Sequence, residues 1–235
     1  MDINQTNSDL IKFWDSHFQD IKPMTIVKED VKVENELDQY LKKLGDTCET
    51  IIDVGCGLGF SLMTAKLLGK KMVNGYGFDT SEKGIEFAKE TVKLSKISDL
   101  EFVTENHHYL DRFDDQSVDG IFCSNFLDVI PRKTSQEVID SMIRIVKPLG
   151  YVLLKLNFYL DEDLIKKLNM EVIDQDTYAI NGILRAHNLT TEAWIDRFKG
   201  FKLVSTGEYQ RAPKMPYDRI ILLQKKGQIK KGGCQ

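Results

Sequence analysis

The stretch "IIDVGCGLGF" at residues 51–60 joins an acidic side chain to a run of glycines, a combination that suits ligand binding. Asp53 stands inside an apolar run typical of a buried strand, and Gly55, Gly57 and Gly59 follow at alternate positions. Glycines let the backbone take positive φ, and they let a ligand approach the main chain closely. One glycine would suit a tight turn without a ligand, whereas three at alternate positions favour a binding loop.

The spacing of these glycines separates two classes of nucleotide ligand. Dinucleotide-binding turns follow the pattern GxGxxG, in which the third glycine allows close packing of a helix. Here the pattern is GxGxG, and Phe60 takes the place of the third dinucleotide glycine, which argues against NAD or FAD. The carboxylate of Asp53 would repel a pyrophosphate but suits a ligand with an ammonium or sulfonium group.

Alternating strands and helices must position this loop. Apolar runs predict strands at 50–54, 72–79, 100–104, 119–125 and 151–159, with helices at 61–69, 81–96 and 135–146 between them. This alternation predicts a parallel sheet covered by helices on both faces. After a helix at 190–200, the strands at 201–209 and 218–226 follow too closely for a helical crossover, so we expect them to pair antiparallel.

The predicted fold class is α/β. We expect a Rossmann-like, doubly wound, mostly parallel seven-stranded sheet with an antiparallel last strand, plus an N-terminal helical cap. The cap is assigned to residues 1–46, the main domain to 47–227 and a flexible tail to 228–235. Within the main domain, residues 161–189 are predicted to be an inserted segment, a short helix followed by a hairpin, that helps to form the acceptor site.

Charge and composition disfavour several classes of partner. The net charge of the 235 residues is −4, so no global basic field draws the chain to nucleic acid. No run approaches the roughly 18 apolar residues of a membrane span, and the N-terminus lacks the pattern of a secretory signal. The four cysteines are scattered without metal-binding spacing. We expect a cytoplasmic monomer or homodimer with no metal, no membrane partner and no nucleic-acid partner.

The stretch "DVGCGLG" at residues 53–59 resembles the first motif of class I S-adenosylmethionine-dependent methyltransferases. The similarity extends over about residues 48–226, with the later motifs of the family in order. In that family an acidic residue at the end of the second strand binds the ribose hydroxyls, and Asp79 stands there, 24 positions after Gly55. The resemblance implies S-adenosyl-L-methionine as cofactor and S-adenosyl-L-homocysteine as product.

The resemblance also implies a cofactor site along the carboxyl edge of the sheet. Many members have an aspartate after the third strand, where this chain has Asn106, whose amide oxygen can still accept from the adenine amino group. Leu58, Phe78 and Leu110 are expected to enclose the adenine. The residues expected to contact the cofactor are Asp53, Gly55, Cys56, Gly57, Gly59, Asp79, Thr80, Asn106, His107, Ser124 and Asn125.

Candidate bases and acceptor contacts come from the sheet edge, the cap and the inserted segment. Methyl transfer is an in-line displacement at a sulfonium, and a general base is needed only when the acceptor is protonated at neutral pH. The candidate catalytic residues are His107, His108, Asp128 and His187. The candidate acceptor contacts are Trp14, Tyr178, Arg185 and His187.

Missing motifs favour a small-molecule acceptor. The segment "CSNFLD" at residues 123–128 lacks the [DNS]PP[YFW] signature of enzymes that methylate amino groups of nucleic acids. No Pro-Cys nucleophile suits cytosine C5 chemistry. The leading hypothesis is therefore methyl transfer to an oxygen, nitrogen or carbon atom of a small molecule. The alternatives are a non-catalytic nucleoside-binding or regulatory protein and a nicotinamide- or flavin-dependent oxidoreductase.

Overall fold

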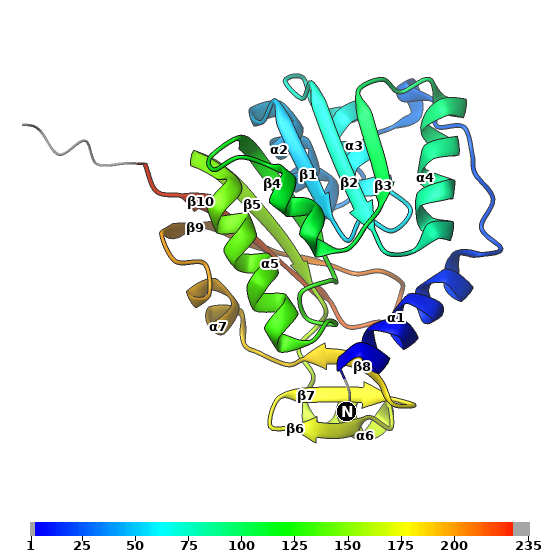
Figure 1. The fold of residues 1–235 in the computed structure, drawn as a ribbon, viewed down its shortest axis with the longest axis vertical. Helices are drawn as coiled ribbons and strands as arrows, with labels where there is room; N and C mark the ends of the chain where they lie inside the picture. The colour runs from blue at the N-terminus through cyan, green and yellow to red at the C-terminus, as the bar shows by residue number, and fades with distance from the viewer. Residues whose placement is uncertain (1–2, 228–235) are drawn as a thin grey trace, which may run out of the picture.

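A seven-stranded sheet forms the centre of the molecule (Figure 1). The computed structural model describes residues 3–227, with side chains from residue 8 onward, so the predicted tail at 228–235 lies outside the described residues. The strand order is β3-β2-β1-β4-β5-β10-β9. The strands are β1 (Thr50–Val54), β2 (Asn74–Asp79), β3 (Leu100–Thr104), β4 (Val118–Ser124), β5 (Val146–Leu156), β9 (Phe201–Tyr209) and β10 (Asp218–Lys225).

Strand pairing confirms the predicted mixed sheet. β1 pairs parallel with both β2 and β4, and the parallel pairing continues outward to β3 and β5. β10 runs antiparallel to both of its neighbours, β5 and β9. β10, the last strand that the structure describes, is thus the reversed strand of this sheet and lies between β5 and β9. The chain order reverses between β1 and β4, which is where open α/β sheets bind their ligands.

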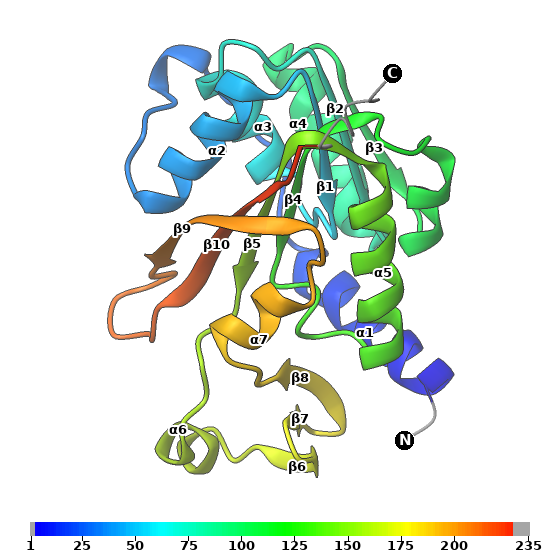
Figure 2. The ribbon, with the colours of Figure 1, turned by 90° about the vertical axis from the view of Figure 1, so that its left-hand side faces the viewer.

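Helices cover both faces of the sheet, and Figure 2 separates the two layers. One buried apolar cluster joins the sheet to α2 (Glu36–Thr47), α3 (Phe60–Leu68) and α4 (Glu82–Ser95). A second cluster joins it to α5 (Arg132–Ile145), α7 (Thr191–Asp196) and the 3₁₀ helix η2 (His107–Arg112). The doubly wound architecture predicted from the alternation of elements is therefore confirmed.

Helix starts follow ordinary capping chemistry. The Ser81 hydroxyl accepts from the Gly84 N–H at 3.1 Å and so starts α4, as the sequence indicates. The side chain of Asn35 accepts from the Asp38 N–H at 3.0 Å and starts α2 in the same way. These caps fix where each helix begins.

The inserted segment forms a separate small sheet. After α6 (Glu162–Lys167) the chain makes three antiparallel strands, β6 (Glu171–Asp174), β7 (Thr177–Ile180) and β8 (Ile183–His187). The predicted hairpin is thus one strand short. Its second turn is the pair Asn181-Gly182, in which both residues have positive φ, at 52° and 71°. Such a pair matches the twist of a two-residue hairpin turn.

The N-terminal region divides into two differently packed helices. α1 (Ile3–Phe18) lies beyond the carboxyl ends of the parallel strands, on the same side as the small sheet (Figure 1), and contacts α4 and β8. The 3₁₀ helix η1 (Lys28–Asp30) and then α2 follow, and α2 buries Leu37, Tyr40, Leu41 and Leu44 in the core. The division into a cap and a main domain stays a prediction.

No helix within residues 3–227 is both long and apolar enough to cross a bilayer. In the same part of the chain, no group of three or more His, Cys, Asp or Glu side chains is arranged to hold a metal ion.

Candidate functional site

The turn after β1 has a backbone that only glycine fits. Gly55, Gly57 and Gly59 have φ values of 68°, 50° and 74°, all in the left-handed region. A Cβ at Gly55 would overlap the ring of Phe126, and one at Gly59 would lie 2.6 Å from the ring of Phe102. The glycines therefore serve both the bend and the close approach of aromatic rings around it.

Asp79 closes this turn from the end of β2. One carboxylate oxygen accepts from the Gly57 N–H at 2.9 Å, and the other accepts from the Ser81 N–H at 2.9 Å. Burial raises the pKa of the Asp79 carboxyl, and the backbone N–H bonds oppose that rise. Each oxygen uses one lone pair for the backbone and keeps another, so the carboxylate can still accept from two hydroxyl groups of a ligand.

Asp53 is a buried acid without a partner. Its side chain is 1% exposed, and neither carboxylate oxygen has a hydrogen-bond partner among the described residues. Burial, and then the nearby Asp79, raise the pKa of Asp53 to about 8. Buried carboxylates are normally paired or hydrogen-bonded. An unpaired acid beside a glycine turn therefore fits a ligand that brings its own positive charge.

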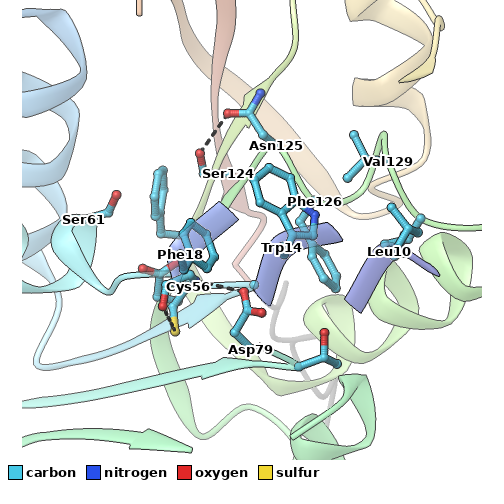
Figure 3. Close-up of a pocket in the computed structure, with 16 residues that line it drawn as sticks. Leu10, Trp14, Phe18, Cys56, Ser61, Asp79, Ser124, Asn125, Phe126 and Val129 are labelled. Atoms are coloured by element: carbon cyan, nitrogen blue, oxygen red, sulfur yellow. Dashed lines mark hydrogen bonds between the residues drawn. The ribbon is translucent and has the colours of Figure 1, made fainter. Parts of the chain in front are cut away.

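A cavity of about 240 Å³ opens over this turn (Figure 3). Asp53 and Asp79 line it, and Ser124 and Asn125 line it from the end of β4. α1 contributes a row of apolar side chains, spaced one helical turn apart, from Leu10, Trp14 and Phe18. α1 therefore closes part of the cavity that the sheet edge leaves open.

A second cavity, of about 220 Å³, adjoins the first. Trp14, Asn125 and Val129 line both cavities, so the two share a wall. The rest of its lining comes from the segment after β5, the connection between α6 and β6, the small sheet and the loop before β10. These residues are Asn157, Phe158, Leu160, Leu168, Met170, Ile180, Arg185, Ala186, Arg211 and Met215.

The structure brings most of the predicted cofactor residues together around the first cavity. Those that line it are Asp53, Gly55, Cys56, Gly57, Asp79, Thr80, Ser124 and Asn125. Gly59 does not line it, because this residue is already the N-cap of α3. The backbone of Asn106 starts η2, and its side chain accepts from the His108 N–H at 2.9 Å.

Five residues predicted on the adenine side do not line the cavity, namely Leu58, Phe78, Asn106, His107 and Leu110. Phe78 and Leu110 are fully buried in the core cluster beneath α5, so neither lines the cavity. His107 lies 3.4 Å from a carboxylate oxygen of Glu137 on α5, also outside the cavity. The cofactor role of each residue stays a prediction, and the lining of the cavity supports the glycine-turn and Asp79 contacts most directly.

The four candidate bases line neither cavity. His108 is exposed and lies 3.1 Å from Asp111. The Asp128 carboxylate is buried and accepts two hydrogen bonds from Asn157, at 2.8 and 2.9 Å. Like these two, His107 lies apart from the cavities. A catalytic role for any of them would require a rearrangement of these contacts.

His187 has both ring nitrogens engaged. Nε2 lies 2.6 Å from the Ile130 carbonyl, and Nδ1 lies 3.1 Å from the Thr177 hydroxyl. The residue is 3% exposed, and burial lowers its pKa. These contacts favour a structural role, in which neutral His187 joins the small sheet to the loop before α5. Of the other candidate acceptor contacts, Trp14 and Arg185 line the second cavity and Tyr178 does not.

Sequence reasoning named Trp14 of the α1 row but missed Leu10 and Phe18, and it also missed Phe126. The spacing of Leu10, Trp14 and Phe18 is a helical stripe, which alone does not distinguish a pocket wall from ordinary packing. Phe126 follows the predicted fourth strand directly, so its place at the sheet edge could have been inferred. The side chains from the loop before β10, such as Arg211, carried no signal.

The amino-acid sequence matches the family model described as "Methyltransferase domain" over residues 46–194, which is more than half of the chain. Among the solved structures, a methyltransferase dependent on S-adenosylmethionine from Methanosarcina mazei has a TM-score of 0.65 at 21% identity. That similarity covers 83% of this chain and 100% of the other. At this identity the likeness establishes the fold.

Three curated relatives illustrate the range of acceptors. A ribosomal protein L11 methyltransferase of Anoxybacillus flavithermus is 30% identical over 67% of this chain and 45% of its own length. A tRNA N(3)-methylcytidine methyltransferase of Schizosaccharomyces pombe is 22% identical, covering 79% and 59%. A ubiquinone biosynthesis O-methyltransferase of Neisseria meningitidis is 24% identical, covering 60% and 55%. The chain thus spans about half the length of these relatives.

Proposed function

The chain belongs to the class I S-adenosylmethionine-dependent methyltransferases, and from that premise we propose that it methylates a small molecule bound in the second cavity. S-Adenosylmethionine is the cofactor, and it supplies an electrophilic methyl group on a sulfonium. Membership of this family sets aside the nicotinamide- or flavin-dependent alternative. The described residues around the first cavity fit the group, because Asp53 offers an unpaired carboxylate and Asp79 offers free acceptor lone pairs.

The observation that carries the proposal is the pair of cavities with a common wall. A methyl acceptor must lie directly beside the methyl donor, since the displacement is in line. The second cavity meets that requirement across Trp14, Asn125 and Val129. Its volume of about 220 Å³ and its mainly apolar lining suit a small organic molecule. The net charge of −4 adds no attraction for nucleic acid.

The lining also bears on how the reaction is assisted. Of the described residues, none of those lining the second cavity is a histidine, lysine, aspartate or glutamate. We therefore propose that no side chain of this cavity acts as a general base. The contribution of the chain is to hold the acceptor in line and to exclude water, for which Trp14 and the neighbouring apolar side chains are suited.

Radiolabelled S-adenosylmethionine tests the class of acceptor. The purified protein is incubated with the labelled cofactor and, separately, with a panel of small organic acids, phenols and amines, with bulk tRNA, and with ribosomal protein L11. We expect label to enter members of the small-molecule panel only. Methylation of tRNA or of L11 at a comparable rate would contradict the proposal, and binding without turnover on any acceptor would favour the non-catalytic alternative.

We also propose a cytoplasmic location and a monomeric or homodimeric state. The described cysteines Cys48, Cys56 and Cys123 are free thiols, which supports a reducing compartment. Sedimentation of the purified protein would measure the oligomeric state.

A further inference from the structure

We propose that the methyl acceptor is an amphipathic carboxylate, with an apolar body in the second cavity and its anionic group paired with Arg185. This inference rests on the proposed function, because it takes the second cavity as the acceptor site. The juxtaposition that supports it is an arginine at the wall of an apolar cavity that adjoins the cofactor cavity, with no acidic partner among the described side chains.

The charges that line the second cavity are all positive. Arg185 and Arg211 are its charged residues among the described part of the chain, and no carboxylate lines it. Arg211 is already paired, since one guanidinium nitrogen lies 2.9 Å from an Asp218 oxygen and 2.9 Å from the Asn157 amide oxygen. Arg185 therefore carries the charge that is still available to a ligand.

Arg185 makes a ring contact in place of an ion pair. Its guanidinium carbon lies 3.9 Å from the centre of the Phe13 ring on α1. No acid among the side chains of residues 8–227 pairs with it, and burial lowers the pKa of its guanidinium. A guanidinium stays protonated in proteins. A half-buried cation without a counter-ion is costly, and an anionic ligand would remove that cost.

A second donor lies where the two cavities meet. The amide nitrogen of Asn125 is buried and has no partner among the described residues, whereas its amide oxygen accepts from Lys155. A carboxylate accepts through both oxygens. The unpaired Arg185 guanidinium and the Asn125 amide thus both favour a ligand that only accepts.

The other residues that line the second cavity indicate the chemistry of the rest of the ligand. Apolar side chains from four parts of the chain enclose it, namely Val129, Phe158, Leu160, Leu168, Met170, Ile180 and Met215. Such a wall favours an apolar or aromatic body. A protonated amine would be repelled by the same positive charge, so amine acceptors are disfavoured.

A purely structural role for Arg185 predicts a different result from a role in binding the acceptor. If the residue served only to hold α1 through Phe13, then Phe13→Leu and Arg185→Gln would have the same effect on ligands. If it binds the acceptor, Phe13→Leu keeps the preference for anions, because the guanidinium remains.

Titration calorimetry on the protein saturated with S-adenosylhomocysteine separates these roles. The probes are 3-phenylpropanoate, 3-phenylpropanamide and 3-phenylpropylamine, which share one apolar body and differ in charge. We expect the carboxylate to bind at least about tenfold more tightly than the amide, and the amine to bind most weakly. Arg185→Gln should remove that preference with a loss of roughly 10- to 100-fold for the carboxylate, and Arg185→Lys should keep part of it.

Two controls keep the result specific. Arg112→Gln removes another cation that lies over a ring, 5.1 Å from the centre of Tyr109, but outside both cavities, so the preference should be unchanged. S-Adenosylhomocysteine should bind Arg112→Gln about as well as it binds the original protein. Phe13→Leu and the Arg185 variants also loosen the contact of α1 with β8, so for these the nucleoside is supplied at a saturating concentration.

The outcomes distinguish the inference from the proposed function. Three results would overturn the proposal of an amphipathic carboxylate acceptor: equal affinities for the three probes, no binding of any probe, or an anion preference that survives in Arg185→Gln. In each case the bound nucleoside would still support the proposed methyltransferase function. Failure of S-adenosylhomocysteine itself to bind the folded protein would remove the proposed function, and the inference with it.

Discussion

At the residue scale, the site depends on two acids that are held in different ways. Asp79 is fixed by two backbone N–H groups and stays oriented without a ligand. Asp53 lies in the same cavity with neither oxygen bonded. A preorganised acceptor loses little entropy on binding. An unpaired buried carboxyl group, which keeps its proton up to a pKa of about 8, ionises when a ligand brings an opposite charge. We therefore expect Asp79 to give position and Asp53 to give electrostatic affinity.

Replacing Asp79 tests the first of these roles. Asp79→Ala removes both acceptor oxygens, so the affinity for S-adenosylmethionine and for S-adenosylhomocysteine should fall by roughly 10- to 100-fold, the cost of losing hydrogen bonds to a charged group. Isothermal titration calorimetry measures both ligands.

Asp119→Ala is a matched control for that change. Asp119 also accepts from a backbone N–H, that of Thr50 at 3.0 Å, but it lies at the opposite edge of the sheet. Its replacement should leave both affinities within about twofold of the original. If Asp79→Ala binds as tightly as this control, the ribose-side assignment is wrong.

At the residue scale, the features that could be located from sequence are those that backbone chemistry decides. The glycine turn and Asp79 could be located, because positive φ and a strand-end acid are local properties. His187 could not be assigned, since its partners, Ile130 and Thr177, are 57 and 10 positions away along the chain. The same holds for the free charge of Arg185, because it depends on whether any of the described acids lies close enough to pair with it in the fold.

At the element scale, α1 is the part of the site that depends least on the sheet. It is attached at α4, where the Ser81 hydroxyl donates to the Asp15 carboxylate at 2.6 Å, and at β8 through the stack of Arg185 on Phe13. Its apolar row nevertheless forms part of both cavities. Cofactor affinity should therefore depend on how firmly α1 is docked.

Asp15→Ala tests that dependence. The change removes the acceptor for Ser81, so α1 should be less firmly held, by about 1 kcal/mol. Amide hydrogen exchange within residues 8–18 should speed up, and the affinity for S-adenosylhomocysteine should fall severalfold. Asp20→Ala, which alters an exposed acid just beyond the helix, should change neither quantity. Faster exchange with unaltered affinity would show that α1 is dispensable for binding.

The elements of the sheet were predictable because periodicity and strand spacing are properties of the sequence. The antiparallel β10 followed from the short connection at 210–217, which excludes a helical crossover. The third strand of the small sheet and the early start of β5 at Val146 were not predicted. In both cases pairing with a neighbouring strand extends the structure beyond what local pattern indicates.

At the scale of the whole molecule, the unpaired Asp53 should make stability depend on pH. The unfolded chain loses this proton near the ordinary pKa of 3.8, whereas the folded protein keeps it up to a pKa of about 8. Between these values the folded state binds more protons, so its stability falls as pH rises. Below about pH 4 the penalty is absent, and above about pH 8 it is complete.

Asp53→Asn removes this titration and serves as the comparison. Across pH 4 to 8 in the absence of cofactor, the free energy of unfolding of the original protein should fall relative to that of Asp53→Asn. At pH 8 the variant should be the more stable by more than about 1 kcal/mol. Urea denaturation followed by circular dichroism measures both proteins, and parallel pH profiles would contradict the assigned ionisation.

The wall formed by Trp14, Asn125 and Val129 has a consequence for how ligands are found. When a ligand in one cavity has ordered these side chains, binding of a second ligand in the adjoining cavity no longer includes that entropic cost. Thermodynamic linkage then requires each ligand to increase the affinity of the protein for the other ligand by the same factor. A binding screen without the nucleoside would therefore measure only the weaker affinity of an acceptor. Acceptors should be screened with the nucleoside bound.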